Sequence, residues 1–102
     1  MAVPDFQSLM LPVLTCANEG EARISDVVET LAVRLGLTDE DRNVVLPSGK
    51  QTRFANRVHW ARSYLKQAGL VAATKRGHFL ITERGKGVLK NPPPRISIAF
   101  LE

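Results

Sequence analysis

The sequence is short of cysteine: its 102 residues contain one, Cys16. A single cysteine cannot form a disulfide within the chain, so a disulfide-stapled secreted fold is excluded and the count suits a reducing cytosol. Cys16 falls within an apolar helical pattern, and no histidine or second cysteine stands near it at metal-ligand spacing. We therefore predict that Cys16 packs in the core and has neither a metal-binding nor a catalytic role.

Long apolar runs are also missing. No stretch approaches the roughly 20 apolar residues that cross a bilayer, and the N-terminus lacks the basic region and apolar run of an export signal. We therefore predict a soluble, cytoplasmic protein with no membrane partner. A chain of 102 residues with 44% hydrophobic residues can bury one core but not two, so a single domain is expected.

Acidic residues are scarce in the second half of the chain. Residues 1–49 carry three Lys or Arg against eight Asp or Glu, a balance of −5, whereas residues 50–102 carry eleven against two, a balance of +9. The net charge of +4 therefore hides a strong asymmetry along the sequence. Basic residues gathered in one half are typical of a surface that binds nucleic acid.

The basic half opens with a long amphipathic helix. Ser48 followed by Gln51 predicts a capping box at its start, and Gly69 followed by Leu70 predicts a left-handed stop at its end. At 100° per residue, its apolar side chains fall on one narrow stripe, which must face a core. The stripe consists of Phe54, Val58, Ala61, Leu65 and Ala68.

The remaining sides of this helix are polar or basic. Arg53 and Arg57 flank the stripe on one side, and Arg62 and Lys66 flank it on the other. A solvated helix usually mixes the two signs of charge, so a helix without any acid predicts a partner that supplies the negative charge. The side opposite the stripe carries Thr52, Asn56, His59, Ser63 and Gln67.

A β-hairpin is expected immediately after the helix. Residues 71–74 and 78–82 are two runs rich in apolar residues, and Lys75, Arg76 and Gly77 separate them. A three-residue connection that ends in glycine is typical of a hairpin whose glycine has a positive φ. Its tip carries two cations, so we interpret the helix and the hairpin as a DNA-reading helix and its wing.

The acidic half predicts a helix first. Asp5 is a suitable N-cap, and Pro12 should bend or restart the helix because it lacks a backbone donor and clashes with the preceding turn. Apolar residues recur at the three-and-four spacing of a buried face. They are Phe6, Leu9, Met10, Val13, Leu14 and Ala17.

A short strand and a second helix are expected next. Residues 22–24 predict a strand that lies against the hairpin, and Ser25 predicts the cap of a helix that ends at Gly36. Thr38 and the three acids after it predict a capped, solvated helix start, because acids at adjacent positions point in different directions and suit a metal ion poorly. Residues 44–46 predict an apolar anchor. Val28, Leu31, Ala32 and Leu35 should face inward.

The chain ends with a helix, a spacer and a tail. Thr82 predicts the cap of the last helix, with Glu83 in its first turn and a stop at Asn91. Val88 and Leu89 should face inward. Three prolines at residues 92–94 predict a stiff extended spacer, and the residues after them alternate as a strand does.

We therefore predict two segments: a winged-helix DNA-binding domain over residues 1–91, and a proline-rich spacer and tail over residues 92–102. The tail either pads the domain or leads into a further region. The expected fold class is mainly α with a small β-hairpin, in the order of a winged helix-turn-helix: helix, short strand, helix, helix, two-stranded wing, helix.

Three stretches combine into a recognisable pattern. They are NRVHWARSYLKQAGL at residues 56–70, RGHFLITERG at residues 76–85 and LPVL at residues 11–14. Asn-Arg-x-x-Trp-Ala, Ala-Gly-Leu and Thr-Glu-x-Gly are specific in combination, and together the stretches resemble the N-terminal domain of the Mrr restriction endonuclease family. The resemblance covers about residues 1–91. It implies a winged helix that binds DNA ahead of a separate nuclease domain on the same parent chain.

The chain departs from the whole enzyme of that family, whose nuclease domain is of the Pro-Asp…(Asp/Glu)-x-Lys type. Pro4 and Asp5 are present, but no acid stands two residues before a lysine, so the groups that would hold a metal and activate water are missing. We predict no enzyme activity, no cofactor and no metal for this chain alone. The resemblance makes modified DNA the expected target of the restriction system.

Two sets of side chains are candidates for DNA contacts. Cations should meet phosphates and release condensed counterions, while side chains near the helix N-terminus should reach base edges, arginine suiting guanine and asparagine or glutamine suiting adenine. The phosphate candidates are Lys50, Arg53, Arg62, Lys66, Lys75 and Arg76. The base-reading candidates are Gln51, Thr52, Arg53 and Asn56.

Several neighbouring residues have two readings. Arg57 lies close to the apolar stripe, so either packing with an ion pair or a DNA contact is open to it. Trp60 and Tyr64 are expected to close the core against the first helix rather than to stack on bases. His59, at an expected exposed helix position, and His78, at a strand start, do not have the spacing of a metal pair.

The preferred hypothesis is a module that binds double-stranded DNA, with the central helix in the major groove and the wing tip on phosphates. The alternative is a winged helix that mediates protein–protein interaction or dimerisation, in which the acidic half of one copy docks on the basic half of another. A third class, a hydrolase in its own right, would require a metal-dependent activity of this chain.

Overall fold

The computed structural model describes residues 6–45, 49 and 51–91. The expectations for Asp5, Leu46, Ser48, Lys50 and residues 92–102, and for the side chain of Phe6, lie outside this part of the chain. In chain order the elements are α1 (Phe6–Asn18), β1 (Ala22–Arg23), α2 (Ile24–Arg34), α3 (Asp39–Arg42), α4 (Arg53–Gln67), β2 (Val71–Lys75), β3 (His78–Ile81) and α5 (Glu83–Lys90).

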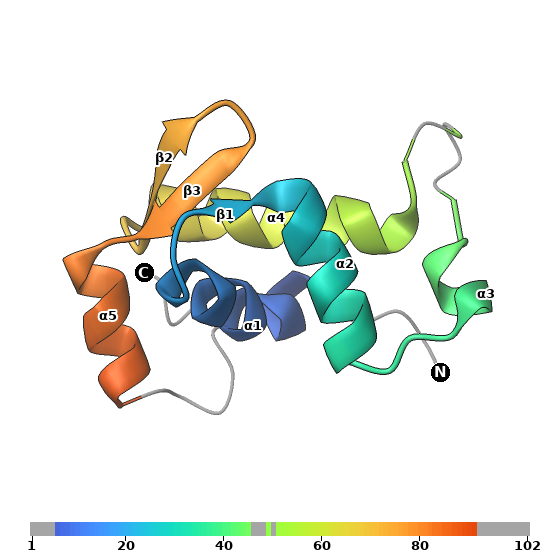
Figure 1. The fold of residues 1–102 in the computed structure, drawn as a ribbon, viewed down its shortest axis with the longest axis horizontal. Coiled ribbons are helices and arrows are strands. Elements are labelled where there is room, and N and C mark those ends of the chain that lie inside the picture. The colour runs from blue at the N-terminus through green and yellow to red at the C-terminus, as the bar shows by residue number, and fades with distance from the viewer. Residues whose placement is uncertain (1–5, 46–48, 50, 92–102) are drawn as a thin grey trace.

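The architecture is mainly helical with a small three-stranded antiparallel sheet, as predicted, and is compatible with a winged helix. In Figure 1, α4 runs above α1 and behind α2, and the β2–β3 hairpin follows its C-terminal end. α3 lies near the opposite end of α4, and α5 lies below the sheet. The long helix and the hairpin are therefore joined at one end of the domain.

The predicted short strand is confirmed as an edge of the sheet. The strand order is β1-β3-β2, with Ala22 opposite Phe79 and Arg23 opposite His78. Ile24, the third residue expected in this strand, instead begins α2, and its N–H donates to the carbonyl of Gly77 at 2.9 Å. The N-terminal end of α2 is thus held by the turn of the hairpin.

The tip of the hairpin is shorter than predicted. Lys75 lies opposite His78, so the turn consists of Arg76 and Gly77 alone, and Gly77 has the expected positive φ of 75°. The register shifts between Ala73 and Lys75, which places a bulge at Thr74. A bulge inserts one unpaired residue and increases the local twist, so a two-residue turn can close strands whose sequence suggests a three-residue loop.

The start of α4 differs from the predicted capping box. The helix begins at Arg53, and its N-cap is Thr52, whose Oγ1 accepts a hydrogen bond from the Ala55 N–H at 3.2 Å. Thr52 also forms an antiparallel bridge with Val45, and the Arg53 N–H donates to the carbonyl of Val44 at 2.7 Å. Because α4 begins only after Thr52, Gln51 lies outside the helix and the predicted start of the helix with a Ser48–Gln51 capping box is wrong.

The N-cap predictions for the other helices were right at two positions and wrong at one. Thr38 forms a reciprocal capping box with Asp41, and Thr82 accepts a hydrogen bond from the Gly85 N–H at 3.1 Å. Ser25 is not a cap, because α2 follows directly from Arg23, which makes no capping bond through its side chain. Asp41 is buried rather than solvated as expected, because its carboxylate is engaged in the box.

Both predicted glycine stops are confirmed. Gly69 has a φ of 79°, and the Leu70 N–H donates to the carbonyl of Leu65 at 2.9 Å, which is the bond pattern of a Schellman motif. Gly36 has a φ of 67° and ends α2 in the same way, with the Leu37 N–H donating to Ala32. The long helix therefore turns into the hairpin through a fixed backbone geometry.

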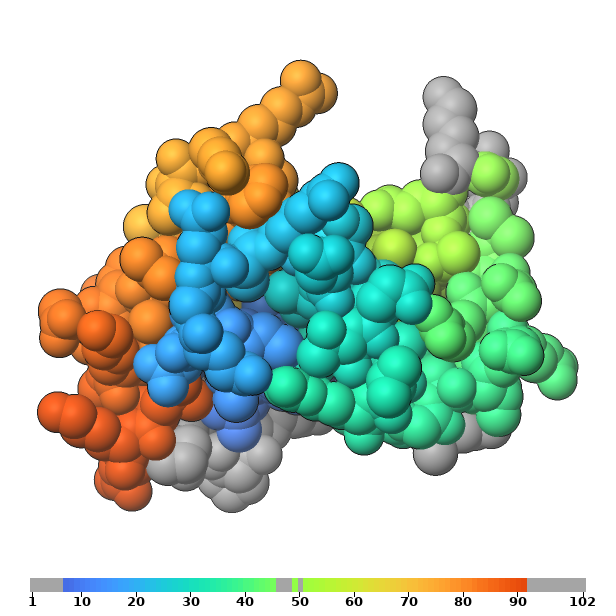
Figure 2. Space-filling view, viewed as in Figure 1, coloured from blue at the N-terminus to red at the C-terminus, as the bar shows by residue number. Residues whose placement is uncertain are grey.

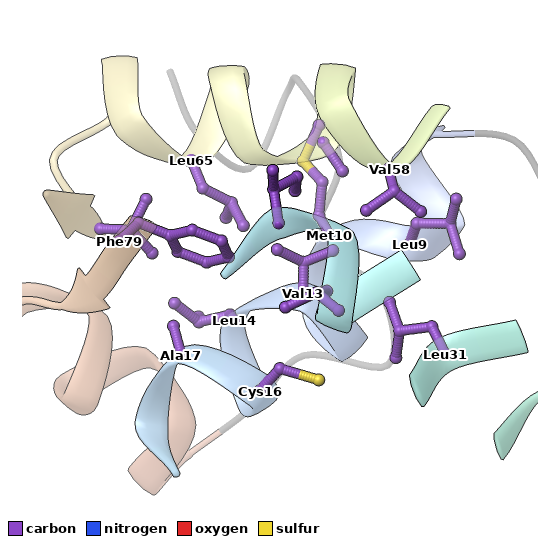
Figure 3. Packing of buried hydrophobic residues seen from close by; sticks show 14 of the residues in the cluster. Leu9, Met10, Val13, Leu14, Cys16, Ala17, Leu31, Val58, Leu65 and Phe79 are labelled. Atoms are coloured by element: carbon purple, nitrogen blue, oxygen red, sulfur yellow. The ribbon is translucent and has the colours of Figure 1, made fainter. Parts of the chain in front are cut away.

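The core forms between α1 and the apolar stripe of α4. Figure 3 shows Leu9, Met10, Val13 and Leu14 of α1 facing α4, with Phe79 of β3 closing one end. The predicted stripe of α4 is confirmed: Phe54, Val58, Ala61 and Leu65 are buried, and Ala68 is packed against the cluster. α1 continues through Pro12 without restarting, and both inward predictions for α5, Val88 and Leu89, are confirmed as partly buried packing.

Cys16 lies in this core, as predicted, and only 8% of its surface is exposed to solvent. Burial raises the pKa of its thiol, with Arg34 opposing and Glu19 adding to the shift. The group is therefore a neutral thiol at physiological pH, and packing is sufficient to explain its presence. The expected apolar anchor at residues 44–46 was wrong for Val45, which is 50% exposed because its backbone, rather than its side chain, holds the connection to Thr52.

One glycine of α5 permits a close approach to the rest of the fold. A Cβ atom at Gly85 would stand 2.3 Å from the carbonyl oxygen of Leu70 and 2.7 Å from Cγ1 of Ile81. The obstacle at Leu70 is backbone, which cannot yield as a flexible side chain would. The first turn of α5 is therefore pressed against the junction between α4 and β2.

We expect Gly85→Ala to destabilise the domain. Alanine is normally better than glycine in a helix by about 1 kcal/mol, but the steric overlap at Leu70 should outweigh this and lower the free energy of unfolding by about 1–3 kcal/mol. Urea unfolding measures the change. Gly87→Ala is the matched control: nothing lies within 4 Å of a Cβ there, so it should be neutral or stabilising. Equal effects at both positions would contradict the packing argument.

Candidate nucleic-acid interface

The core packing of α4 decides which of its sides face outward. Its apolar stripe is buried against α1, so the opposite side and the two flanks are available to solvent or a partner. The hairpin at its C-terminal end projects from the body of the domain, and its tip stands clear above β1 and α2 in Figure 2. A long helix and a projecting wing are thus the two elements that carry the candidate residues.

The base-reading candidates lie just before α4 and in its first turn, and they differ in the contacts that they already make. Thr52 is engaged as the N-cap, and the Asn56 side chain donates to Oε1 of Gln51 at 3.2 Å. Arg53 is exposed, and its side chain makes no hydrogen bond or ion pair with another described residue. Arg53 is accordingly the most available of the four, whereas Gln51 and Asn56 would first exchange their mutual bond for one to a base.

One flank of α4 carries Arg62 and Lys66 beside a surface hollow of about 350 Å³, lined by these two residues with Ser63 and Gln67. Lys66 is exposed, while Arg62 is half-buried and its Nε has no hydrogen-bond partner among the described residues. Every lining side chain can donate a hydrogen bond, and two are cations. The hollow therefore suits an anionic acceptor such as a phosphate oxygen.

The other flank contains the clearest departure from the sequence expectations. Trp60 is 53% exposed and does not close the core as predicted, whereas Tyr64 is half-buried and packs against the core cluster. The two rings lie 6.2 Å apart between centroids and are tilted by 38°. Arg57, on the same flank, is half-buried, and both of its proposed roles stay open.

The wing carries the remaining cations. Arg76 is exposed in the turn. Lys75 lies at the end of β2, and its Nζ is 3.8 Å from a carboxylate oxygen of Glu21, with both side chains largely exposed. His78 is bonded through Nδ1 to the carbonyl of Arg76 at 3.0 Å, which ties it to the turn. Sequence reasoning missed Glu21, because only the folded register brings the turn before β1 beside the wing.

Two acids of the first half pair with cations of the same half. Glu19 makes two hydrogen bonds to Arg34, at 3.0 and 3.1 Å, and Glu29 pairs with Arg42. The Arg34 guanidinium holds the pKa of Glu19 below its ordinary value through these bonds and through its charge. Lys75 differs from these first-half pairs, because it is a DNA candidate of the second half and its ammonium lies 3.8 Å from a carboxylate oxygen of Glu21.

His59 is half-buried, which corrects the expectation of an exposed position. Burial lowers the pKa of its imidazole, and the charge of Arg62 lowers it further. The neutral form is therefore favoured in the folded state. Across residues 6–45, 49 and 51–91 there is no group of three His, Cys, Asp or Glu side chains that could hold a metal ion. No helix within the same residues is both long and apolar enough to cross a membrane.

We expect His59 to make folding stability depend on pH. Its folded-state pKa lies below the ordinary value of 6.5, so the unfolded chain binds the proton more readily. The contribution is present above pH 6.5 and is lost as the pH falls through the lower folded-state pKa. His59→Gln should remove this part of the difference in unfolding free energy between pH 7 and pH 5, measured by urea titration. An unchanged pH dependence in the variant would show that His59 carries none of it.

Comparison with known proteins agrees with this architecture. Residues 6–91 match the Mrr N-terminal domain family. The chain is also 39% identical over 97 residues to the type IV methyl-directed restriction enzyme EcoKMrr of Escherichia coli (strain K12). That alignment covers 92% of this chain but 32% of the relative, so the chain corresponds to an N-terminal domain and not to a whole restriction enzyme.

No solved structure matches the chain. The family match extends over all the described helices and strands and contains the candidate residues from Gln51 to Arg76. The resemblance noted in the sequence is therefore confirmed: this chain belongs to the Mrr N-terminal domain family.

Proposed function

We propose that the domain binds double-stranded DNA as the target-recognition part of an Mrr-like restriction system protein. α4 lies in the major groove in this proposal, and the wing tip contacts phosphates beside it. The observation that carries the proposal is the surface of α4: it has basic residues on both flanks and no acid anywhere along its length. Lys50, which lies outside the described residues, is part of the proposed set on sequence grounds.

The dimensions of the helix fit this role. Fifteen residues at about 1.5 Å each give α4 a length of about 22 Å, and the major groove, about 12 Å wide, admits an α-helix. A helix in that groove turns its outer side to the base edges and its flanks to the two phosphate walls. Arg53 on one flank and Arg62 with Lys66 on the other are then placed for opposite strands.

The nature of the target follows from the relative. EcoKMrr is a methyl-directed restriction enzyme, and we propose that the DNA bound by the present domain carries methylated bases. We also propose a nuclease domain on the parent chain, because the present chain spans 32% of the relative's length. The present domain would then bind the DNA, and the nuclease domain of the parent chain would cleave it.

The alternative of a self-associating module is less well supported. It requires acids of the first half to meet cations of a second copy, but Glu19 and Glu29 are engaged by Arg34 and Arg42 within the same chain. A dimer held by such contacts would dissociate with salt in the absence of DNA. Sedimentation of the free domain at low and high salt distinguishes the two proposals, because a DNA-binding monomer shows no change in mass.

We expect duplex binding to weaken steeply between roughly 50 and 200 mM salt, since each phosphate contact adds about 0.9 to the log-log slope. The double variant Lys75→Ala, Arg76→Ala should flatten that slope by about two units. Fluorescence anisotropy with a labelled duplex gives the slope. A wild-type slope near zero would refute the DNA-binding proposal.

The matched control removes two cations from α5. Lys86→Ala with Lys90→Ala changes the net charge equally, but α5 lies below the sheet, away from the wing tip (Figure 1). The salt slope of this control variant should stay close to that of the wild type. If both double variants flatten the slope equally, net charge alone controls binding and no oriented interface exists.

We expect Glu21→Gln to tighten duplex binding about two- to fivefold at 0.15 M salt, because the exposed pair with Lys75 is worth less than about 1 kcal/mol and its loss frees the lysine for phosphate. Titration of the labelled duplex measures the gain. Glu83→Gln is the control, since Glu83 pairs with Lys86 on α5 at 3.3 Å. Because salt screens charges beyond about 8 Å, Glu83→Gln should leave duplex binding unchanged. An equal gain in affinity from Glu83→Gln would contradict a local effect of Glu21.

A further inference from the structure

Trp60 is the feature of α4 that phosphate binding does not use. It is 53% exposed on a helix whose other outward residues are polar or basic, and it is the only tryptophan of the chain. A large aromatic side chain that the core leaves uncovered marks a contact surface when it stands within a charged interface. Charge attraction to phosphates gives no reason for an indole here, so its contact must be of another kind.

The position of Trp60 follows from that of Arg53. The two residues are seven apart, which places them within about 20° of each other around the helix and about 10 Å apart along it. Trp60 therefore lies on the same flank two turns later, about three base steps from Arg53 along one strand. It is also turned about 60° from the centre of the outer side, so it faces the base edges as well as the groove wall.

The side chain is held in place by its neighbour. The ring of Tyr64, which packs against the core, lies one turn away with its centroid 6.2 Å from that of Trp60. A tryptophan supported in this way presents a broad apolar face with little freedom to lose on binding. The chemical groups that an apolar face can distinguish in the major groove are methyl groups on bases, as in the apolar contacts to the thymine methyl.

We propose that Trp60 is the residue through which the domain distinguishes methylated from unmethylated DNA, by apolar contact with a base methyl group in the major groove. This rests on the proposed function, since it requires α4 to lie in that groove. The methyl group belongs either to C5 of cytosine or to N6 of adenine. Both project into the major groove, and the same contact removes either one from water.

The experiment compares three duplexes of one mixed sequence: unmodified, with 5-methylcytosine at several positions, and with N6-methyladenine at several positions. The wild-type domain should bind one of the methylated duplexes about four- to tenfold more tightly than the unmodified duplex, as expected for burying one methyl group or a little more. The duplex that is preferred identifies the base. Equal binding of all three would overturn the proposal.

Variants separate this role from stability and from phosphate binding. Trp60→Ala should abolish the preference while keeping the salt slope, and Trp60→Phe should restore part of the preference. Lys66→Ala is the matched control: it should weaken all three duplexes equally and keep their ratio. A preference that survives Trp60→Ala would overturn the proposal, while a flat salt response in the wild type would instead refute DNA binding itself.

The emission of Trp60 gives an independent readout, because no other tryptophan contributes to it. Binding of the preferred methylated duplex should quench or shift the emission more than binding of the unmodified duplex at equal saturation. No difference between the two complexes would overturn the direct contact. Urea unfolding of Trp60→Ala completes the test, since an exposed side chain should cost little stability and a folded variant keeps the binding data interpretable.

Discussion

The packing of α1 against the apolar stripe of α4 is the interaction on which the rest of the structure depends. Four stripe residues, Phe54, Val58, Ala61 and Leu65, are almost completely buried. Burying such side chains contributes roughly 1.5–3 kcal/mol each for the larger ones, so rotation of α4 about its axis is strongly opposed. Because the helix cannot rotate, the assignment of its other sides is settled as well. The basic flanks, the outer side and Trp60 are presented to solvent as a consequence of hydrophobic packing on the far side of the same helix.

The distribution of charge also depends on how the helices pack. Acids and cations of the first half pair with each other on α2, α3 and the turn before β1, as Arg34 does with Glu19. The cations of α4 stand on a helix without acids, and the register of β1 against β3 brings the carboxylate of Glu21 beside the wing. Exposed ion pairs contribute little stability, so folding alone does not require this arrangement of charge.

Local patterns predicted most of the elements, and their failures have a common cause. The stripe of α4, the stops at Gly69 and Gly36 and the caps at Thr38 and Thr82 depend on neighbours in sequence, and they were right. The cap of α4 was wrong because Ser48 and Thr52 are both suitable residues, and the choice between them is made by a bridge to Val45. The burial predicted for Trp60 was wrong because Trp60 lies about 120° around the helix from the centre of the stripe, beyond the part of α4 that the core covers. The individual DNA contacts remain predictions.

The junction between α4 and the wing explains how the two could act as one surface. The hydroxyl of Thr82 donates to the carbonyl of Gly69 at 2.6 Å, and its N–H donates to the carbonyl of Leu70 at 3.0 Å. The same hydroxyl accepts from the N–H of Gly85, whose missing side chain allows α5 to approach Leu70. One residue therefore ties together the end of α4, the start of β2 and the start of α5. A wing anchored in this way has a fixed direction relative to α4, so in the proposed complex the contacts at its tip set the depth and register of the helix in the groove.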